Sequence, residues 1–335
     1  MDDTIRGDAM KNRAVGLRSA GRQLGALPGI LACLTGMVLL ACGGAFADPP
    51  QTLAEARQQF STNLISQVKN SDPVPTPPAG VLSVVQYDSP VGPLNAYVTP
   101  SPGDGVAHPA IVWCHGGDCN TIGDVWSPQP ADNDQSAAAY RQAGIIVMYP
   151  SLRGGNQNPG SEEKYYGEVD DVVAAGHYLA SLPYVDSNRV YLGGHSNGAT
   201  LALLVSEYTD QFRCVFSLDP ISYLGPGGVY MSNAPFDKIN KTEFDLRSPI
   251  LWLAGIKSPT FVFSGTGSPS NQDSFQALAQ AQNSPATHYL LVPGATHFTL
   301  VGPANQVIAQ KILQDTAATP NIQFTNDDIA AIAPH

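Results

Sequence analysis

Apolar residues in this chain gather in short unbroken runs, which alternate with longer segments where they recur every three or four positions. Unbroken runs are typical of strands buried on both faces, and the longer spacing is typical of helices with one buried side. The pattern predicts strands at 81–87, 94–98, 110–114, 145–149, 189–192, 212–218, 260–264 and 288–292. It predicts helices at 136–143, 168–182, 199–208, 273–282 and 305–315, and a short helix within 51–68.

Strands that alternate with helices predict βαβ units, and hence an α/β fold with a mostly parallel central sheet and helices on both faces. We expect a leader at 1–47, a helix and proline-rich linker at 48–80, the α/β domain at 81–316 and a tail at 317–335. The longest interruption, 221–259, falls between two strands. It is either a lid or pocket wall, or a packed surface excursion.

The first 47 residues combine a basic start, an apolar stretch at 24–41 and the sequence Ala45-Phe46-Ala47. This order predicts a secretory signal cleaved after Ala47, and hence a secreted or periplasmic protein with no stable membrane span after processing. Leu39-Leu40-Ala41-Cys42 also resembles a lipoprotein box, so lipidation at Cys42 is an alternative. An uncleaved anchor is a third, because the apolar stretch is near spanning length.

The composition of the 335 residues narrows the class of protein. Hydrophobic residues make up 43% and charged residues 13%, which fits a globular domain with a large core. The net charge of −11 argues against nucleic acid as a partner. We find no metal-ligand spacing and expect no metal and no cofactor. In an oxidising compartment Cys114 and Cys119 could form a disulfide, whereas Cys214 is expected as a small core residue.

The stretch that carries the chemistry is Gly194-His195-Ser196-Asn197-Gly198, between a predicted strand and a predicted helix. A Gly-x-Ser-x-Gly turn in that setting exposes the serine hydroxyl at the tip of a strained turn, and the glycines admit close backbone approach. Ser196 is therefore the candidate nucleophile. We expect the backbone N–H of Asn197 to face the space in front of the hydroxyl, and His195 to pack beneath the turn.

Two more polar clusters follow predicted strands, at the edge where active sites of parallel sheets lie. His115-Gly116-Gly117 follows the strand that ends at residue 114. Its glycines can turn a backbone N–H toward an oxyanion, which makes Gly117 the candidate donor beside Asn197. His115 is expected to brace this loop. His297 follows the last strand and is the candidate general base that a serine nucleophile needs.

The acid that orients His297 is expected between the serine and the histidine in the chain. The loop after the strand at 260–264 is its commonest position, yet the first carboxylate there is Asp273, where an aspartate is often a helix cap. Asp219 follows the preceding strand and is our preferred acid. A Ser-His dyad supported by a water or a neutral group is a third arrangement.

Taken together, these residues resemble the α/β-hydrolase superfamily, and within it the catalytic domain of prolyl oligopeptidase-type and dienelactone hydrolase-like enzymes. The resemblance covers about residues 81–316. It rests on the turn at Ser196 and on His115-Gly116-Gly117, Tyr149-Pro150-Ser151-Leu152-Arg153-Gly154, Glu168-Val169-Asp170-Asp171-Val172, Val185-Asp186-Ser187-Asn188-Arg189-Val190 and Gly294-Ala295-Thr296-His297-Phe298.

The resemblance implies an α/β-hydrolase fold in which Ser196 is the nucleophile, His297 the base and the Asn197 amide an oxyanion donor. Members of that branch commonly have an aspartate near Ser268, and this chain does not. Leu218-Asp219-Pro220 is instead similar to pancreatic-type lipases, whose acid follows the earlier strand.

We therefore expect a serine hydrolase that cleaves an ester, or a small peptide or amide bond, through an acyl-enzyme. The substrate is expected to be a small-molecule ester or a short peptide. We identify no residues that would recognise the side chain of a peptide substrate, which favours the ester. A prolyl oligopeptidase-type serine peptidase is the alternative within enzymes. A non-catalytic binding protein on the same fold is the alternative from another class.

Overall fold

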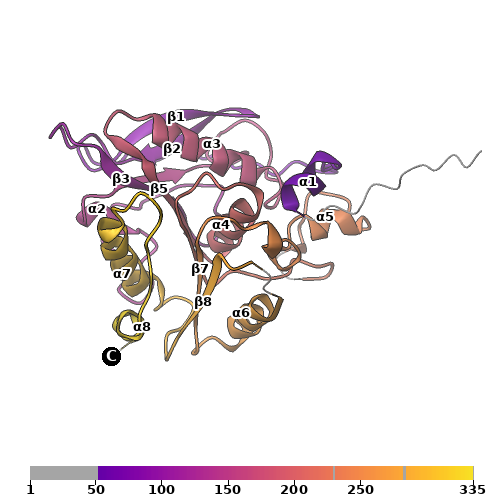
Figure 1. Cartoon of the computed structure of the whole chain (residues 1–335). Helices are drawn as coiled ribbons and strands as arrows, with labels where there is room; N and C mark the ends of the chain where they lie inside the picture. The colour runs from indigo at the N-terminus through magenta and orange to yellow at the C-terminus, as the bar shows by residue number, and fades with distance from the viewer. Residues whose placement is uncertain (1–51, 229–230, 282–283, 335) are drawn as a thin grey trace, which may run out of the picture. The chain divides into compact units, whose positions relative to one another are not determined.

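The computed structural model describes residues 52–228, 231–281 and 284–334. The predicted leader lies outside them. Within these ranges eight strands form one sheet, in the order β1-β2-β4-β3-β5-β6-β7-β8 (Figure 1). The strands are β1 (Ser83–Ser89), β2 (Gly92–Val98), β3 (His108–Cys114), β4 (Ile146–Pro150), β5 (Val185–His195), β6 (Val215–Leu218), β7 (Thr260–Gly265) and β8 (Thr287–Val292). Only the β1–β2 and β2–β4 pairings are antiparallel, which confirms the mostly parallel α/β sheet.

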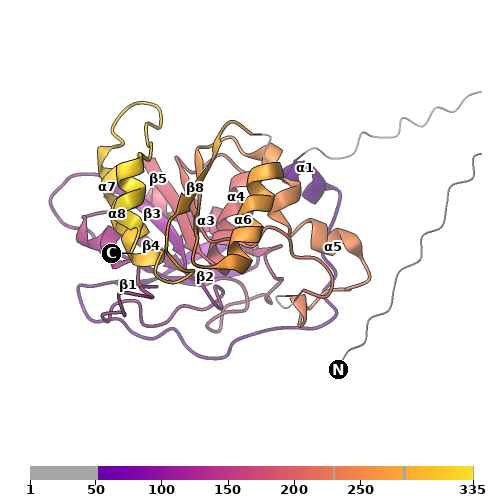
Figure 2. The ribbon, with the colours of Figure 1, turned by 90° about the horizontal axis from the view of Figure 1, so that it is seen from below.

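The helices cover both faces of this sheet. They are α1 (Leu53–Gln58), α2 (Ala138–Gln142), α3 (Glu168–Ser181), α4 (Asn197–Tyr208), α5 (Lys241–Asp245), α6 (Pro269–Ala281), α7 (Val301–Gln314) and α8 (Asn326–Ile332), with short 3-10 turns η2 (Pro249–Leu251) and η3 (Leu253–Gly255). In Figures 1 and 2, α7 and α8 lie together on one side of the sheet, and α4 and α6 lie on the other.

The unbroken apolar runs fill two cores at once, because successive side chains of a strand point to opposite faces. In β3, Ala110 and Val112 join the core that contains residues of α3 and α4. Ile111 and Trp113 join the core that contains residues of α2, α7 and α8. All four side chains are fully buried. The pattern that predicts the strand therefore also explains why both layers of helices are held to it.

The helix expected within 51–68 is shorter than the apolar spacing indicates. It spans Leu53–Gln58 and begins at Thr52, whose side chain forms a capping box with Glu55. After it the chain is extended and pairs with the domain, since Leu64 forms a β-bridge with Phe236. The tertiary pairing overrides the helical spacing here. Tyr97 also donates a hydrogen bond to the carbonyl oxygen of Pro75, so the expected linker lies on the domain surface.

The segment expected as a tail contains a packed helix. α8 begins with a second capping box, between Thr325 and Asp328. Ile332 at its end is fully buried, and Asp328 forms an ion pair with Lys311 of α7 at 2.7 Å. These contacts place residues up to at least 332 in the same packed unit as the sheet. The boundaries of the predicted domains otherwise stay predictions.

The long interruption at 221–259 is a packed excursion in its described part, rather than a free lid. Phe236, Phe244 and Leu246 are buried. Arg247 and Glu243 form an ion pair at 2.7 Å with almost no exposure of either side chain. The same guanidinium donates to the carbonyl oxygen of Glu163 at 3.0 Å and to Oγ1 of Thr62 at 2.9 Å. These two bonds, made outside the excursion, tie it to the domain and satisfy the buried charge.

The three cysteines of the described chain, Cys114, Cys119 and Cys214, are free and buried. The disulfide considered for Cys114 and Cys119 is therefore not formed in this structure. Burial raises the pKa of the Cys114 thiol to about 12, so this thiol is neutral and a poor nucleophile. No helix among the described residues is long and apolar enough to cross a membrane.

Glu207, near the end of α4, places a carboxyl group in an apolar core. It is 2% exposed, and among the described residues neither carboxyl oxygen has a hydrogen-bond partner. Burial holds the pKa of this carboxyl well above its usual value. The folded protein therefore keeps a proton that the unfolded chain releases. Stability must fall as the pH rises from the unfolded pKa toward the folded one.

We expect Glu207→Gln to raise the free energy of unfolding at pH 8 by at least about 1.4 kcal/mol, because the wild type loses that much for each pH unit between the unfolded and folded pKa and the amide does not titrate. At pH 4 the carboxyl is largely protonated in both states, and the variant should match the wild type. Chemical denaturation at the two pH values measures both differences. An equal effect at pH 4 and pH 8 would contradict the assignment of a protonated Glu207.

Candidate active site

Ser196 lies on the turn between β5 and α4, as the sequence predicts. Its backbone has φ 55° and ψ −117°, a conformation that costs energy for any residue with a side chain. The turn is tight because α4 starts against β3. A Cβ on Gly198 would lie 2.0 Å from the carbonyl oxygen of Cys114, and one on Gly194 would lie 2.4 Å from that of Gly198. Both outer positions of the motif therefore require glycine.

His297 lies in the loop between β8 and α7, at the same edge of the sheet as Ser196. Its Nδ1 is 3.2 Å from Oδ2 of Asp219, and its side chain is 22% exposed. Its ring packs on that of His195, the residue before Ser196, with the centroids 4.4 Å apart. Since Nδ1 faces the carboxylate, Nε2 is the nitrogen left to receive a proton.

Asp219 stands at the carboxyl end of β6 in a restrained position. Its φ is 56°, its backbone N–H donates to the carbonyl oxygen of Phe263 at 2.8 Å, and its side chain is fully buried. Its Oδ1 has no partner among the described residues. The competing carboxylate, Asp273, is exposed on α6. Of these two, Asp219 is the one that meets His297.

The side chain of Asn271 meets the same ring. Its amide lies against Nδ1 of His297. Asn271 belongs to the first turn of α6, directly after the loop that follows β7. The sequence gives no signal for this contact, because 26 residues separate the two positions and a neutral amide in a helix has no distinctive pattern.

Gln135 connects the three loops of the site. The N–H of Gly116 donates to Gln135 Oε1 at 3.2 Å, and Gln135 Nε2 lies 3.0 Å from Nδ1 of His195. Nε2 of His195 lies 2.8 Å from the carbonyl oxygen of His297. A carbonyl only accepts, so Nε2 carries the hydrogen and Nδ1 accepts from Gln135. Burial lowers the pKa of His195 to about 4, which keeps this neutral tautomer.

The two candidate oxyanion donors lie side by side. Asn197 Nδ2 donates to the carbonyl oxygen of Gly117 at 2.7 Å, and Gly117 has φ 76°. Asn197 begins α4, where the first backbone N–H groups have no partner inside the helix and carry partial positive charge. The ring nitrogens of His115 contact the carbonyl oxygens of Gly116 and Thr121, so His115 braces the loop as expected.

A cavity of about 250 Å³ opens beside Asn197. One wall carries strain, because Lys164 and Tyr165 have φ 54° and 76°. Lys164 forms an ion pair with Glu162 at 2.6 Å. The cavity is lined by Gly117, Asp118, Cys119, Asn120, Glu162, Lys164, Tyr165 and Asn197. Its lining is therefore mostly polar, and three of its side chains bear charge.

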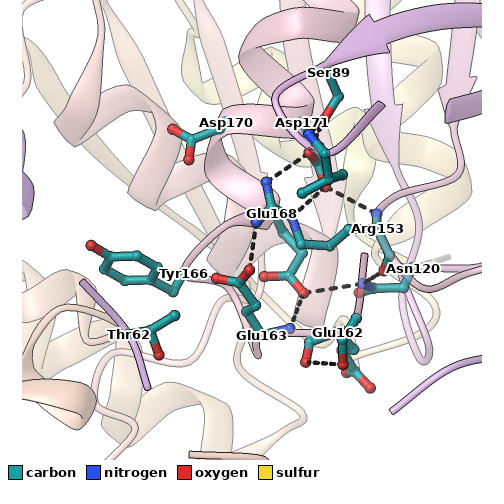
Figure 3. A network of polar contacts seen from close by, with 12 residues as sticks. Thr62, Ser89, Asn120, Arg153, Glu162, Glu163, Tyr166, Glu168, Asp170 and Asp171 are labelled. Carbon is teal, nitrogen blue, oxygen red and sulfur yellow. Dashed lines mark hydrogen bonds and ion pairs between the residues drawn. The ribbon is translucent and has the colours of Figure 1, made fainter. Parts of the chain in front are cut away.

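A polar network (Figure 3) includes Asn120 and Glu162, which also line the cavity. Arg153 makes two bonds of 2.9 Å to Asp171 and one of 2.6 Å to Glu163. Glu168 accepts from the N–H of Glu163 at 2.6 Å and from Asn120 at 3.1 Å. Burial raises the pKa of Glu168 to about 7. Two motifs that carry the family resemblance, at 149–154 and 168–172, thus meet in a scaffold beneath the cavity.

Comparison with models of known protein families identifies the family to which this chain belongs. The model of the prolyl oligopeptidase family matches residues 132–313, more than half of the chain. The chain belongs to the prolyl oligopeptidase family. The chain therefore belongs to a family of serine hydrolases on the α/β-hydrolase fold, as the resemblance implies. The match includes Ser196, Asp219 and His297, whereas Gly117 precedes it. A comparison with curated proteins gives no match.

Solved structures share the fold. A puromycin-hydrolysing peptidase of Mycobacterium tuberculosis is 21% identical with a TM-score of 0.54, over 70% of this chain and 39% of that one. An acylaminoacyl peptidase of Pyrococcus horikoshii is 15% identical with a TM-score of 0.55, over 74% and 44%. A 2,6-dihydroxy-pseudo-oxynicotine hydrolase is 13% identical with a TM-score of 0.54, over 73% and 72%. The chain thus spans less than half the length of the two peptidases, and these identities show the fold alone.

Proposed function

We propose that this family member cleaves an ester, or a small peptide or amide bond, through an acyl-enzyme. Ser196 is the nucleophile, His297 the general base and Asp219 the acid that orients it. The observation that carries the proposal is the contact of 3.2 Å between His297 Nδ1 and Asp219 Oδ2, on the ring that packs beside the Ser196 turn. The family match, which spans all three residues, supports it.

In the proposed reaction, Ser196 Oγ attacks the acyl carbonyl carbon while its proton passes to His297 Nε2. The carbon–oxygen or carbon–nitrogen bond to the leaving group then breaks, and that group takes the proton from Nε2. Water attacks the acyl carbon and gives a proton to the same nitrogen, which passes it to Ser196 Oγ as the acyl bond breaks and the acid is released. The buried Asp219 carboxylate stabilises the imidazolium that forms in each half.

The N–H groups of Gly117 and Asn197 are proposed to hold the oxyanion. Donors fixed in place before the reaction contribute most, because they need no rearrangement as charge develops. The side-chain bond from Asn197 to the carbonyl oxygen of Gly117 supports this role, since it ties the two donor segments together. We propose no metal or cofactor for the reaction.

Two kinds of substrate remain in the proposal. The family match and the peptidases among the similar structures favour a short peptide or amide. The mostly polar cavity beside Asn197 offers no apolar slot for a large side chain, which favours a small ester. We also propose, from the predicted signal at 1–47, that the protein is secreted or periplasmic.

A fluorophosphonate probe tests the mechanism, because it reacts with activated serines. We expect the wild type to be labelled on the peptide that contains Ser196, and Ser196→Ala to remain unlabelled. Lack of labelling of the wild type, or equal labelling of the variant, would contradict the proposal. Short-chain p-nitrophenyl esters and aminoacyl p-nitroanilides then separate the substrate classes, and turnover of amides alone would exclude the ester.

A further inference from the structure

Nδ1 of His297 is approached by two side chains from different elements. Asp219 reaches Nδ1 from the end of β6, with Oδ2 at 3.2 Å. The amide of Asn271 lies against the same Nδ1 from the first turn of α6. Both contacts therefore fall on the hydrogen-bonding position that fixes the tautomer and plane of the ring.

The chemistry of this position decides which end of the amide faces the ring. A carboxylate oxygen accepts hydrogen bonds only, so Nδ1 beside Asp219 must carry the hydrogen. An amide NH₂ group cannot donate to a nitrogen that carries its own hydrogen. The oxygen and nitrogen of an asparagine amide have nearly the same shape, and their assignment follows from the partners. Here the partners require Oδ1 of Asn271 to face Nδ1.

The turn that contains Asn271 also holds the backbone of the base. The N–H of His297 donates to Oγ of Ser268, and the N–H of Gly267 donates to the carbonyl oxygen of Ala295 at 2.8 Å. Residues 267–271 thus contact the loop of His297 both at its backbone and at its ring. This clamp explains how a loop histidine with 22% of its side chain exposed keeps one orientation.

We infer that Asn271 is a positioning residue, which accepts a hydrogen bond from Nδ1 of His297 through its amide oxygen and shares this task with Asp219. The inference rests on the proposed function, in which His297 is the base. The two partners differ in what they contribute. Asp219 contributes a buried charge that favours the imidazolium, and Asn271 contributes direction without charge. A carboxylate at position 271 on α6 could therefore also accept the hydrogen bond from Nδ1 of His297.

The test places a carboxylate at each position in turn, in the full chain. Asn271→Asp adds a second carboxylate at the ring, and a nearby negative charge favours the protonated form of an imidazole. We expect the pH of half-maximal kcat/KM on the acid side to rise by about one unit. Gln272→Asp, the next residue on the helix, adds the same charge without the contact. We expect it to leave the profile within about 0.3 units of the wild type.

The double variant Asp219→Asn/Asn271→Asp moves the carboxylate from β6 to α6. We expect it to recover at least about tenfold in kcat over Asp219→Asn alone, since the new carboxylate can restore the tautomer. Asn271→Ala should lower kcat by about tenfold, because the ring loses direction but keeps its charge partner. Circular dichroism and thermal unfolding check that each variant is folded.

Two results would overturn the inference: identical pH profiles for Asn271→Asp and Gln272→Asp, or no recovery in a double variant that is folded. A purely structural tie between α6 and the loop of His297 gives both results. Failure of the proposed function looks different, because the wild type would then be inactive and unlabelled, or Ser196→Ala would keep the wild-type activity. Loss of activity in Ser196→Ala and Asp219→Asn, with no effect at position 271, rejects the role of Asn271 alone.

Discussion

Replacing Ser196 by alanine is expected to lower kcat/KM by about 10⁵- to 10⁶-fold, the largest effect of any single substitution in the chain. In the proposed mechanism the Ser196 hydroxyl forms the acyl-enzyme, and the turn that carries it holds a strained backbone of φ 55° and ψ −117°. Some catalysis should remain above the uncatalysed rate, about 10³-fold, because the oxyanion donors and the substrate contacts are left in place.

Progress curves with an activated ester, run at high enzyme concentration, measure this loss. Ser206→Ala is the matched control, since it removes a buried hydroxyl near the other end of the same helix, where Ser206 bonds to the carbonyl oxygen of Leu203. We expect the control to keep at least about half of the wild-type kcat. An alanine variant at position 196 with more than a few per cent of wild-type activity would show that another group is the nucleophile.

The fold could be predicted in most of its elements because local pattern and tertiary burial agree. β3 and β7 are unbroken apolar runs, and both are buried on two faces. Agreement fails where long-range pairing decides the structure. The spacing within 51–68 indicates a helix, yet the helix ends at Gln58 because the chain beyond it pairs with Phe236. Nothing in the sequence around Leu64 indicates that it pairs with Phe236.

The candidate site divides in the same way. Ser196 could be found from its motif, since Gly194 and Gly198 are required by close backbone contacts that any such turn makes. His297 and Asp219 could be placed at strand ends from chain order. Their contact depends on the neighbouring positions of β6, β7 and β8 in the sheet, which the sequence only implies.

Gln135 and Asn271 could not be found in this way. Each is a neutral amide whose role comes from one contact across many residues: 60 between Gln135 and His195, and 26 between Asn271 and His297. Amides occur throughout the chain without such roles, so neither residue type nor spacing distinguishes these two. A side chain whose role is to orient another can be recognised only from the three-dimensional structure, which shows the contact between them.

Replacing Asp219 by asparagine is expected to lower kcat by about 10³- to 10⁴-fold, with a much smaller change in KM. An asparagine has the size of the aspartate, so the buried position can accept it. Its amide lacks the charge that stabilises the imidazolium and can present an NH₂ group to Nδ1, which favours the wrong tautomer of His297. The effect should fall on the rate because the carboxylate acts on the base rather than on the bound substrate.

Asp273→Asn provides the control for this prediction, because Asp273 is the other carboxylate that chain order allows. It is exposed on α6, and a change of an exposed charge there should alter kcat less than about twofold. The reverse pattern, with Asp273→Asn inactive and Asp219→Asn active, would assign the acid to α6. Small effects of both substitutions would indicate a Ser-His dyad whose base is oriented by neutral groups, and Asn271 is the neutral group already in contact with Nδ1.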